Sequence, residues 1–135
     1  MAKFSATDYK ITINGTNLST SLNSVELALE SDDLETTAFG TTFRERIGGL
    51  KSGSVTLQFM QDFAASSVDA TLFPLYNTLA TVVIVPTSST VSATNPSYTA
   101  VCLVNSYSPF ASSVGDIATF SITLPTSGTV TRATS

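Results

Sequence analysis

A β-hairpin is predicted by residues 33–47, which read Asp33-Leu34-Glu35-Thr36-Thr37-Ala38-Phe39-Gly40-Thr41-Thr42-Phe43-Arg44-Glu45-Arg46-Ile47. We place its turn at Gly40-Thr41. In the register that this turn sets, Leu34 faces Ile47 and Glu35 faces Arg46. Most apolar side chains then lie on one side and the charged ones on the other, with an ion pair between Glu35 and Arg46. A slip of one residue would destroy this separation, so the pattern specifies the register.

The hairpin, over about residues 33–51, is expected to project from the rest of the molecule. It carries Phe39 and Phe43 near its tip, and exposed aromatic side chains on a projecting element are typical of a docking surface. Gly48-Gly49 follows the hairpin and is predicted to act as a hinge.

Strands are predicted for most of the remaining chain. Apolar and polar residues alternate in residues 9–13, 25–30, 55–59 and 117–124, the pattern of half-buried strands. Residues 81–85 and 99–104 are apolar on both faces, as in strands at the centre of a sheet or beneath another subunit. Asn14-Gly15 marks a tight turn, and the Ser/Thr/Pro-rich residues 86–97 and 125–135 are expected to be connectors or tails.

One helix is predicted at about residues 67–79. Ser67 and Asp69 suit a helix N-terminus, and apolar residues then recur at spacings of three and four. Pro74 lacks a backbone N–H, so the helix is expected to be short or bent. Its apolar stripe is interpreted as core, with a ligand groove as the minor alternative.

The composition argues against an enzyme. Histidine is absent from the 135 residues, so the commonest general base and metal ligand are both missing. No phosphate-binding glycine loop, zinc spacing or nucleophile motif occurs. The acids around Asp32 lack the glycine turn of a calcium loop, and Cys102, in an apolar run, is expected to be an inert buried thiol. We therefore predict no catalytic residues, no metal and no cofactor.

Charge is scarce. Charged residues make up 12% of the chain, against about 25% in ordinary soluble domains. Serine and threonine together number 42, and the net charge is −4, the wrong sign for tight binding to nucleic acid. Two interpretations remain open: much of the surface is covered by other copies of the chain, or the protein is simply a β-protein with threonine-rich strands.

A resemblance to a known family is carried by the segment Phe39-Gly40-Thr41-Thr42-Phe43-Arg44-Glu45-Arg46-Ile47-Gly48-Gly49-Leu50-Lys51-Ser52-Gly53-Ser54-Val55. Together with Leu57-Gln58-Phe59, Gln61-Asp62-Phe63 and residues 67–75, it resembles the major tail tube proteins of long, non-contractile-tailed bacteriophages. The end of the chain is similar to that family's last strand and tail, at Gly115-Asp116, Thr119-Phe120-Ser121 and Pro125-Thr126-Ser127-Gly128. The resemblance covers nearly the whole chain, and its motifs are structural rather than catalytic.

The resemblance implies a mainly β fold, a two-sheet β-sandwich or barrel with one flanking α-helix. Residues 1–135 would form a single tail-tube domain with an N-terminal arm at about 1–8 and a C-terminal tail at about 126–135. Six copies would join their sheets into a ring, and rings would stack into a tube. By this reading the inter-ring contact includes Phe39, Gly40, Phe43, Arg44 and Arg46.

The resemblance also implies a role and partners. The chain would be a structural virion protein of the phage tail, made in the host cell cytoplasm, and double-stranded DNA would pass through the tube during ejection without specific binding. Glu26 and Glu30 are the candidates for the lumen surface. The implied partners are the chain itself, a tape measure protein, a tail terminator and distal tail proteins, with no membrane.

The alternative function is that of an immunoglobulin-like adhesin or a carbohydrate-binding β-sandwich module. Such modules are commonly secreted, and this sequence opens without the basic and then apolar segment of a signal peptide, which weakens the alternative.

Overall fold

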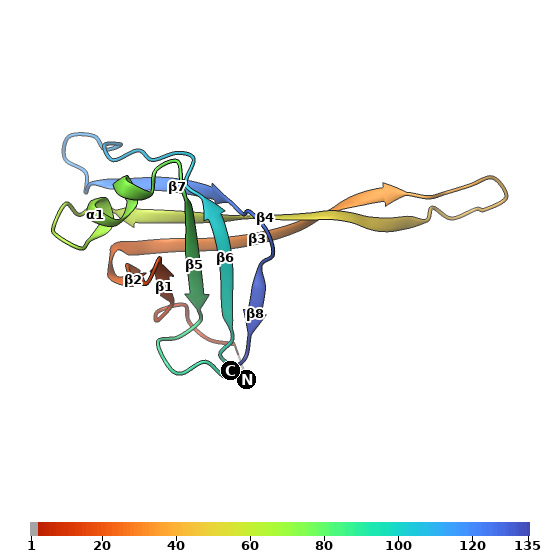
Figure 1. Ribbon diagram of the computed structural model, residues 1–135, viewed down its shortest axis with the longest axis horizontal. Helices are drawn as coiled ribbons and strands as arrows, with labels where there is room; N and C mark the ends of the chain where they lie inside the picture. Colours follow the sequence, from red (N-terminus) through yellow and green to blue (C-terminus); the bar gives the residue numbers. More distant parts are fainter. Residues whose placement is uncertain (1–2) are drawn as a thin grey trace.

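The structure is a computed structural model that describes residues 3–135. Two antiparallel β-sheets pack together, with a short helix against them (Figure 1), so the predicted mainly β sandwich with a flanking helix is confirmed. Sheet A has the strand order β2-β1-β5-β6-β8 and sheet B the order β3-β4-β7. The strands are β1 (Lys10–Ile13), β2 (Thr16–Asn17), β3 (Leu22–Glu35), β4 (Arg46–Met60), β5 (Leu79–Val85), β6 (Ser97–Leu103), β7 (Thr119–Pro125) and β8 (Thr131–Ala133).

The core lies between the two sheets. On β4, Val55, Leu57 and Phe59 are fully buried, and their partners on β7 are apolar as well. The rings of Phe59 and Phe120 stack with their centroids 5.3 Å apart. Since side chains alternate between the two faces of a strand, the intervening residues of β4 point away from the core. The alternation in the sequence therefore identified this strand and its buried face correctly.

The two strands predicted to be apolar on both faces lie at the centre of sheet A. β5 pairs with β1 on one side and with β6 on the other, and β6 pairs with β8. The Asn14-Gly15 turn is also confirmed, because Asn14 and Gly15 both have positive φ, at 48° and 85°, and join β1 to β2. The Asn14 side chain accepts a hydrogen bond from the Thr81 N–H at 2.7 Å, which ties this turn to β5.

The predicted helix at 67–79 is shorter in the structure. The α-helix α1 (Val68–Leu72) continues as a single 3-10 turn, η2 (Phe73–Leu75), and Leu79 already belongs to β5. Pro74 cannot donate the backbone hydrogen bond that a longer helix needs, and Asn77 has a positive φ of 66°, which turns the chain towards β5. Val68 and Leu72 are fully buried and Leu75 packs against the core, so this part of the apolar stripe is core as predicted. Tyr76 and Leu79, at the end of the predicted stripe, are each 54% exposed, so the prediction is wrong for them.

Both ends of the chain differ in part from expectation. The tail predicted at about 126–135 contains β8, which pairs with β6 from Ser97↔Ala133 to Thr99↔Thr131. The described part of the predicted N-terminal arm, residues 3–8, contains no strand, and Asp8 accepts hydrogen bonds from the backbone N–H and hydroxyl of Ser88. Residues 1–2 of that predicted arm lie outside the described residues.

The projecting hairpin (residues 33–51) is the distal part of β3 and β4, which leave the body together as one long two-stranded ribbon (Figure 1). Gly48-Gly49 is not a hinge between separate elements, because both glycines lie inside β4 and Gly48 pairs with Asp33. The register shifts between Ser31 and Asp33, a β-bulge. A Cβ atom on Gly49 would lie 2.9 Å from the Asp32 Cβ, so close strand approach requires glycine there.

Among residues 3–135, no helix combines the length and the apolar character needed to cross a bilayer.

Candidate functional site

The tip of the projecting hairpin has aromatic side chains that the rest of the chain leaves uncovered. Every residue from 29 to 48 is exposed, Phe39 completely and Phe43 to 83%. Gly40 has a positive φ of 93°, which glycine adopts without the steric cost that a Cβ would bring. The Thr41 hydroxyl donates to the Ala38 carbonyl at 2.8 Å and closes the turn. The turn therefore lies where the sequence predicted it.

Charged side chains pair diagonally across the hairpin. Arg44 Nη1 donates to Glu35 Oε1 at 3.2 Å, and Arg46 Nη1 donates to Asp33 Oδ2. The predicted register is confirmed, since Leu34 pairs with Ile47 and Glu35 with Arg46. The predicted Glu35–Arg46 ion pair is wrong, because the twist of a two-stranded ribbon brings long side chains at diagonal positions together.

These ion pairs fix geometry more than they add stability. All four side chains remain about half exposed or more, and exposed pairs contribute about 0.2–1 kcal/mol each. The backbone bond from Thr36 N–H to Glu45 O, at 2.8 Å, and the bond from Glu45 N–H to the Thr37 hydroxyl, at 2.9 Å, continue the strand pairing towards the tip. The hairpin thus extends as an ordered element with Arg44 and Arg46 on its charged side.

Sheet B has two long strands at its edges. β3 and β7 are the outer strands in the order β3-β4-β7, with 14 and 7 residues. The edges of sheet A, β2 and β8, have only 2 and 3 residues. Long edges present rows of unpaired N–H and C=O groups, which are suited to pairing with a strand of another chain.

The backbone of β7 shows which groups point to its outer edge. Thr126 N–H donates to Gly53 O at 3.0 Å, and Gln61 N–H donates to Ala118 O at 2.8 Å. Even-numbered residues of β7 therefore direct their backbone groups towards β4. The N–H and C=O groups of Ser121 and Thr123 point to the outer edge, whereas those of Thr119, on the same edge, are bonded to the Ser112 hydroxyl.

The outer face of sheet B is polar and, where charged, acidic. It is defined by the residues that alternate with the buried ones: Ser24, Glu26, Ala28, Glu30, Ser52, Ser54, Thr56, Gln58, Met60, Thr119, Ser121 and Thr123. The hydroxyls of Thr56 and Thr123 lie 3.4 Å apart across the strands. Glu26 and Glu30 are exposed, and they are the only charged residues in this set. The structure brings the two predicted lumen candidates to one face.

An apolar groove runs beside β3, where the sandwich is open. It has a volume of about 380 Å³ and is lined by Tyr9, Val25, Leu27, Leu29, Ile84, Pro86 and Tyr98. Leu29, at the root of the projecting hairpin, is exposed. Apolar surface along a free strand edge is typical of a place that another chain covers.

The described residues include two titratable groups whose pKa values are raised by desolvation. Among residues 3–135, no three acidic or cysteine side chains gather as metal ligands would. Cys102 is buried and free, and desolvation raises its pKa to about 11, so it stays a neutral thiol. Burial, together with a smaller contribution from the hydrogen bond to Asp69, likewise raises the pKa of Tyr107 to about 12.

The comparisons with known proteins agree on the fold. The chain superposes on a chain of a structure described as the virion of a native gene transfer agent (GTA) particle, with a TM-score of 0.78. The two chains are 12% identical, and the alignment covers 97% of this chain and 99% of that one. This chain has the same fold.

A second structure, described as the tail of an empty GTA particle computed with helical refinement and C6 symmetry, gives a TM-score of 0.66. The identity is 13%, over 82% of this chain and 81% of that chain. No protein-family model matches the sequence, and no curated protein matches it. The GTA chains thus share the two-sheet fold with this chain over most of their length.

Three features of the surface were missed by the sequence reasoning. Asp33 was not assigned a partner, although its place two residues before Glu35 puts it on the same face of β3. The free edges of sheet B depend on which strands pair, and the sequence alone does not show this. The third is a pair of stacked aromatic rings, Phe63 and Phe110, which come together from distant parts of the chain.

Proposed function

We propose that this chain is a structural virion protein whose copies assemble into rings of six and stack into a phage-type tail tube. The observation that carries the proposal is that β3 and β7 are the outer strands of a sheet whose outer face is polar, with the backbone groups of Ser121 and Thr123 directed outward from β7. Joining β7 of one copy to β3 of the next would remove both edges from solvent, and repetition around an axis would close a ring.

The comparisons support this proposal. The GTA tail structure that shares the fold is described as computed with helical refinement and C6 symmetry. The sparse charge of this chain, 12% of its residues, suits a molecule whose surface is largely covered by copies of itself. The projecting hairpin supplies a contact that reaches beyond the ring, so we place Phe39, Gly40, Phe43, Arg44 and Arg46 at the contact between rings.

The outer face of sheet B would line the lumen. With Glu26 and Glu30 as its charged residues, this face would repel phosphate groups, and DNA could pass without binding. We propose a location in the virion tail after synthesis in the host cytoplasm, no enzymatic activity, and end contacts with a tape measure protein, a tail terminator and distal tail proteins.

The test is negative-stain electron microscopy of the purified protein over a range of concentrations. We expect rings of six copies and, at higher concentration, tubes of stacked rings. A persistent monomer at every concentration would overturn the proposal, and glycan binding by that monomer would support the adhesin or carbohydrate-binding alternative.

A further inference from the structure

An aromatic stack lies uncovered near helix α1. The rings of Phe63 and Phe110 have their centroids 5.5 Å apart with an angle of 26° between their planes. Their exposed fractions are 55% and 83%. Two large rings that stack on each other and remain in water form an apolar surface that a partner can cover.

Hydrogen bonds hold this stack in place. Gln61 Nε2 donates to the Pro109 carbonyl at 3.0 Å and contacts the Tyr107 hydroxyl at 3.2 Å, and that hydroxyl donates to Asp69 Oδ1 on α1 at 2.7 Å. The Tyr107 ring also packs edge-on against Phe120 of the core, with centroids 5.4 Å apart. Phe110, one residue after Pro109, is therefore presented by an anchored segment.

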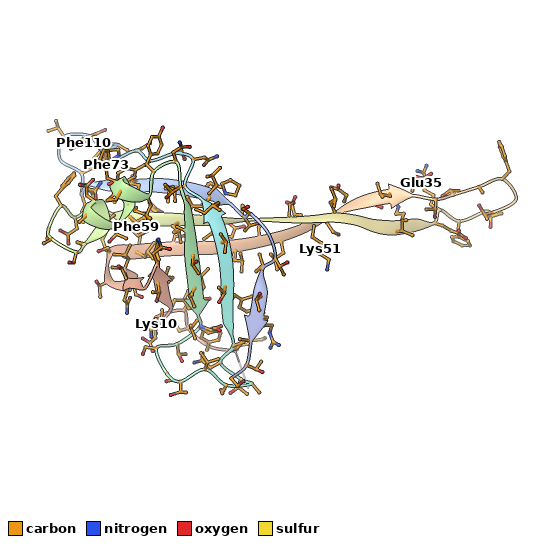
Figure 2. All side chains as sticks on the ribbon, viewed as in Figure 1. Lys10, Glu35, Lys51, Phe59, Phe73 and Phe110 are labelled. Carbon is orange, nitrogen blue, oxygen red and sulfur yellow. The ribbon has the colours of Figure 1, made fainter. Side chains whose placement is uncertain are left out.

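The stack and the hairpin tip lie at opposite ends of the longest axis of the molecule. Figure 2 shows Phe110 and Phe73 beside α1 at one end and Glu35 on the hairpin at the other. One copy cannot bring these two surfaces together. A contact between them joins two different surfaces of two copies, and a contact of this kind repeats from copy to copy.

The hairpin is mixed in charge, with Asp33, Glu35 and Glu45 beside Arg44 and Arg46, whereas the part of the chain that contains the stack has acids alone. The acids between residues 60 and 118 are Asp62, Asp69 and Asp116, and this part of the chain contains no lysine or arginine. Arg44 and Arg46 lie behind the hairpin tip, and the Arg44 side chain is 74% exposed. A guanidinium group has five N–H donors, so Arg44 has donors left beyond the single hydrogen bond to Glu35.

We propose that the Phe63–Phe110 stack is the acceptor site for the hairpin tip of a second copy of this chain. Phe39 and Phe43 would pack on the stacked rings, while Arg44 faces the carboxylates beside them. The inference rests on the proposed tube function and adds to it the surface on which each hairpin ends. Gln61, Tyr107 and Asp69 act as positioning residues for this surface.

The first test mixes two variants. In one, Phe39→Ser and Phe43→Ser remove the tip; in the other, Phe63→Ser and Phe110→Ser remove the stack. Truncation of aromatic anchors at an interface lowers an association constant about thirtyfold or more, so neither variant should form tubes alone. Mixed together, they retain one intact tip and one intact stack, so we expect pairs of rings and nothing longer. Tubes of wild-type length from the stack variant would overturn the inference, whereas wild-type protein that forms no rings would overturn the proposed function.

The second test is a cysteine cross-link, which does not depend on loss of assembly. Cys102 is buried, so an introduced surface cysteine reacts alone. Under mild oxidation, assembled protein with Phe39→Cys and Phe110→Cys should give a ladder of covalently linked copies. A matched control pairs Phe39→Cys with Thr90→Cys, an exposed position in the 86–96 connector. A ladder in the first protein alone supports the acceptor site, and tubes that give no ladder, or a ladder in the control as well, overturn it while leaving the tube function intact.

Discussion

Glu35 and Arg46 lie directly opposite each other on β3 and β4, yet each binds a different partner. Glu35 accepts from Arg44, and Arg46 donates to Asp33, so two diagonal ion pairs cross the hairpin. The two diagonal ion pairs connect four residues along the length of the hairpin, whereas a single Glu35–Arg46 pair would connect two residues directly across it. The charged side of the hairpin is thereby fixed in one arrangement, and changes to it should be detected in assembly rather than in the stability of the subunit.

Replacing Arg46 tests that arrangement. Arg46→Glu places an acid beside Asp33 and opposite Glu35 on an exposed surface. Since exposed pairs contribute only about 0.2–1 kcal/mol, we expect the melting temperature of the subunit to change little and tubes to become shorter. Arg46→Lys is the matched control, because it keeps the charge. If the tubes of the Arg46→Glu variant had unchanged length, the charged side of the hairpin would not be part of the contact between rings.

Proline on the free edge of β7 tests the joining of sheets. Ser121→Pro removes an N–H that points away from β4, and proline is tolerated on an edge where that N–H faces solvent. We expect a folded subunit that no longer forms rings, measured by circular dichroism and electron microscopy. Ser121→Thr keeps the N–H and serves as control. Normal rings from Ser121→Pro would exclude this edge from the contact between copies.

Substitution of Gly49 tests whether the bulge in the projecting hairpin requires a residue without a Cβ atom. A Cβ at this position would meet the Asp32 Cβ at 2.9 Å and the Leu34 side chain at 3.2 Å, whereas at Gly48 it would meet nothing within 4 Å. Gly49→Val should therefore destabilise the subunit by about 1 kcal/mol or more and impair tube formation. Gly48→Ala should be nearly neutral in thermal unfolding, and equal effects of the two changes would contradict this account of the bulge.

Alkaline pH should weaken the positioning of the aromatic stack. Burial raises the pKa of Tyr107 from 10.0 to about 12, so at pH between these values the unfolded chain loses the proton while the folded chain keeps it. Stability from this group is complete below pH 10.0 and falls as pH rises towards about 12. Cys102, with a pKa raised to about 11, adds a loss of the same sign that begins lower. With Tyr107→Phe, the free energy of unfolding, measured by denaturant titration at each pH, should fall less at the upper end of this pH range. An unchanged dependence of the unfolding free energy on pH would contradict this assignment to Tyr107.

Hydrogen exchange should distinguish free from assembled hairpins. β3 ends at Glu35 and β4 begins at Arg46, so amides in residues 38–44 lie outside the strand pairing and should exchange fast in unassembled subunits. In tubes we expect slow exchange there, since the tip would be covered. Amides of residues 55–59, in the core, should be slow in both states. Slow exchange of the tip in the free subunit would contradict its role as a docking element.

The sequence predicted those features whose information is local. The hairpin register could be predicted because acids, arginines and apolar residues separate onto two sides in only one alignment, and Leu34 indeed pairs with Ile47. The strand over residues 55–59 could be predicted from alternation. The diagonal ion pairs could not, because they depend on the twist of the ribbon and not on residue order.

Other features depend on contacts between distant segments. β8, with Thr131, Arg132 and Ala133, shows no apolar alternation, and it is a strand because β6 offers it an edge. The helix was predicted too long because the spacing of apolar residues continues past Pro74, where the backbone no longer allows a helix. The exposure of the tip aromatics Phe39 and Phe43 was predicted. The Phe63–Phe110 stack was not, since only the folded chain brings the two rings together.

The projecting hairpin leaves the body at one end only, and this gives the molecule a direction (Figure 1). A filament in which all copies point the same way is polar: one terminus would display hairpin tips and the other would display bare aromatic rings. The addition of copies at one end of the filament and the termination at the other would then involve chemically different surfaces. A cap for one terminus would have no affinity for the other.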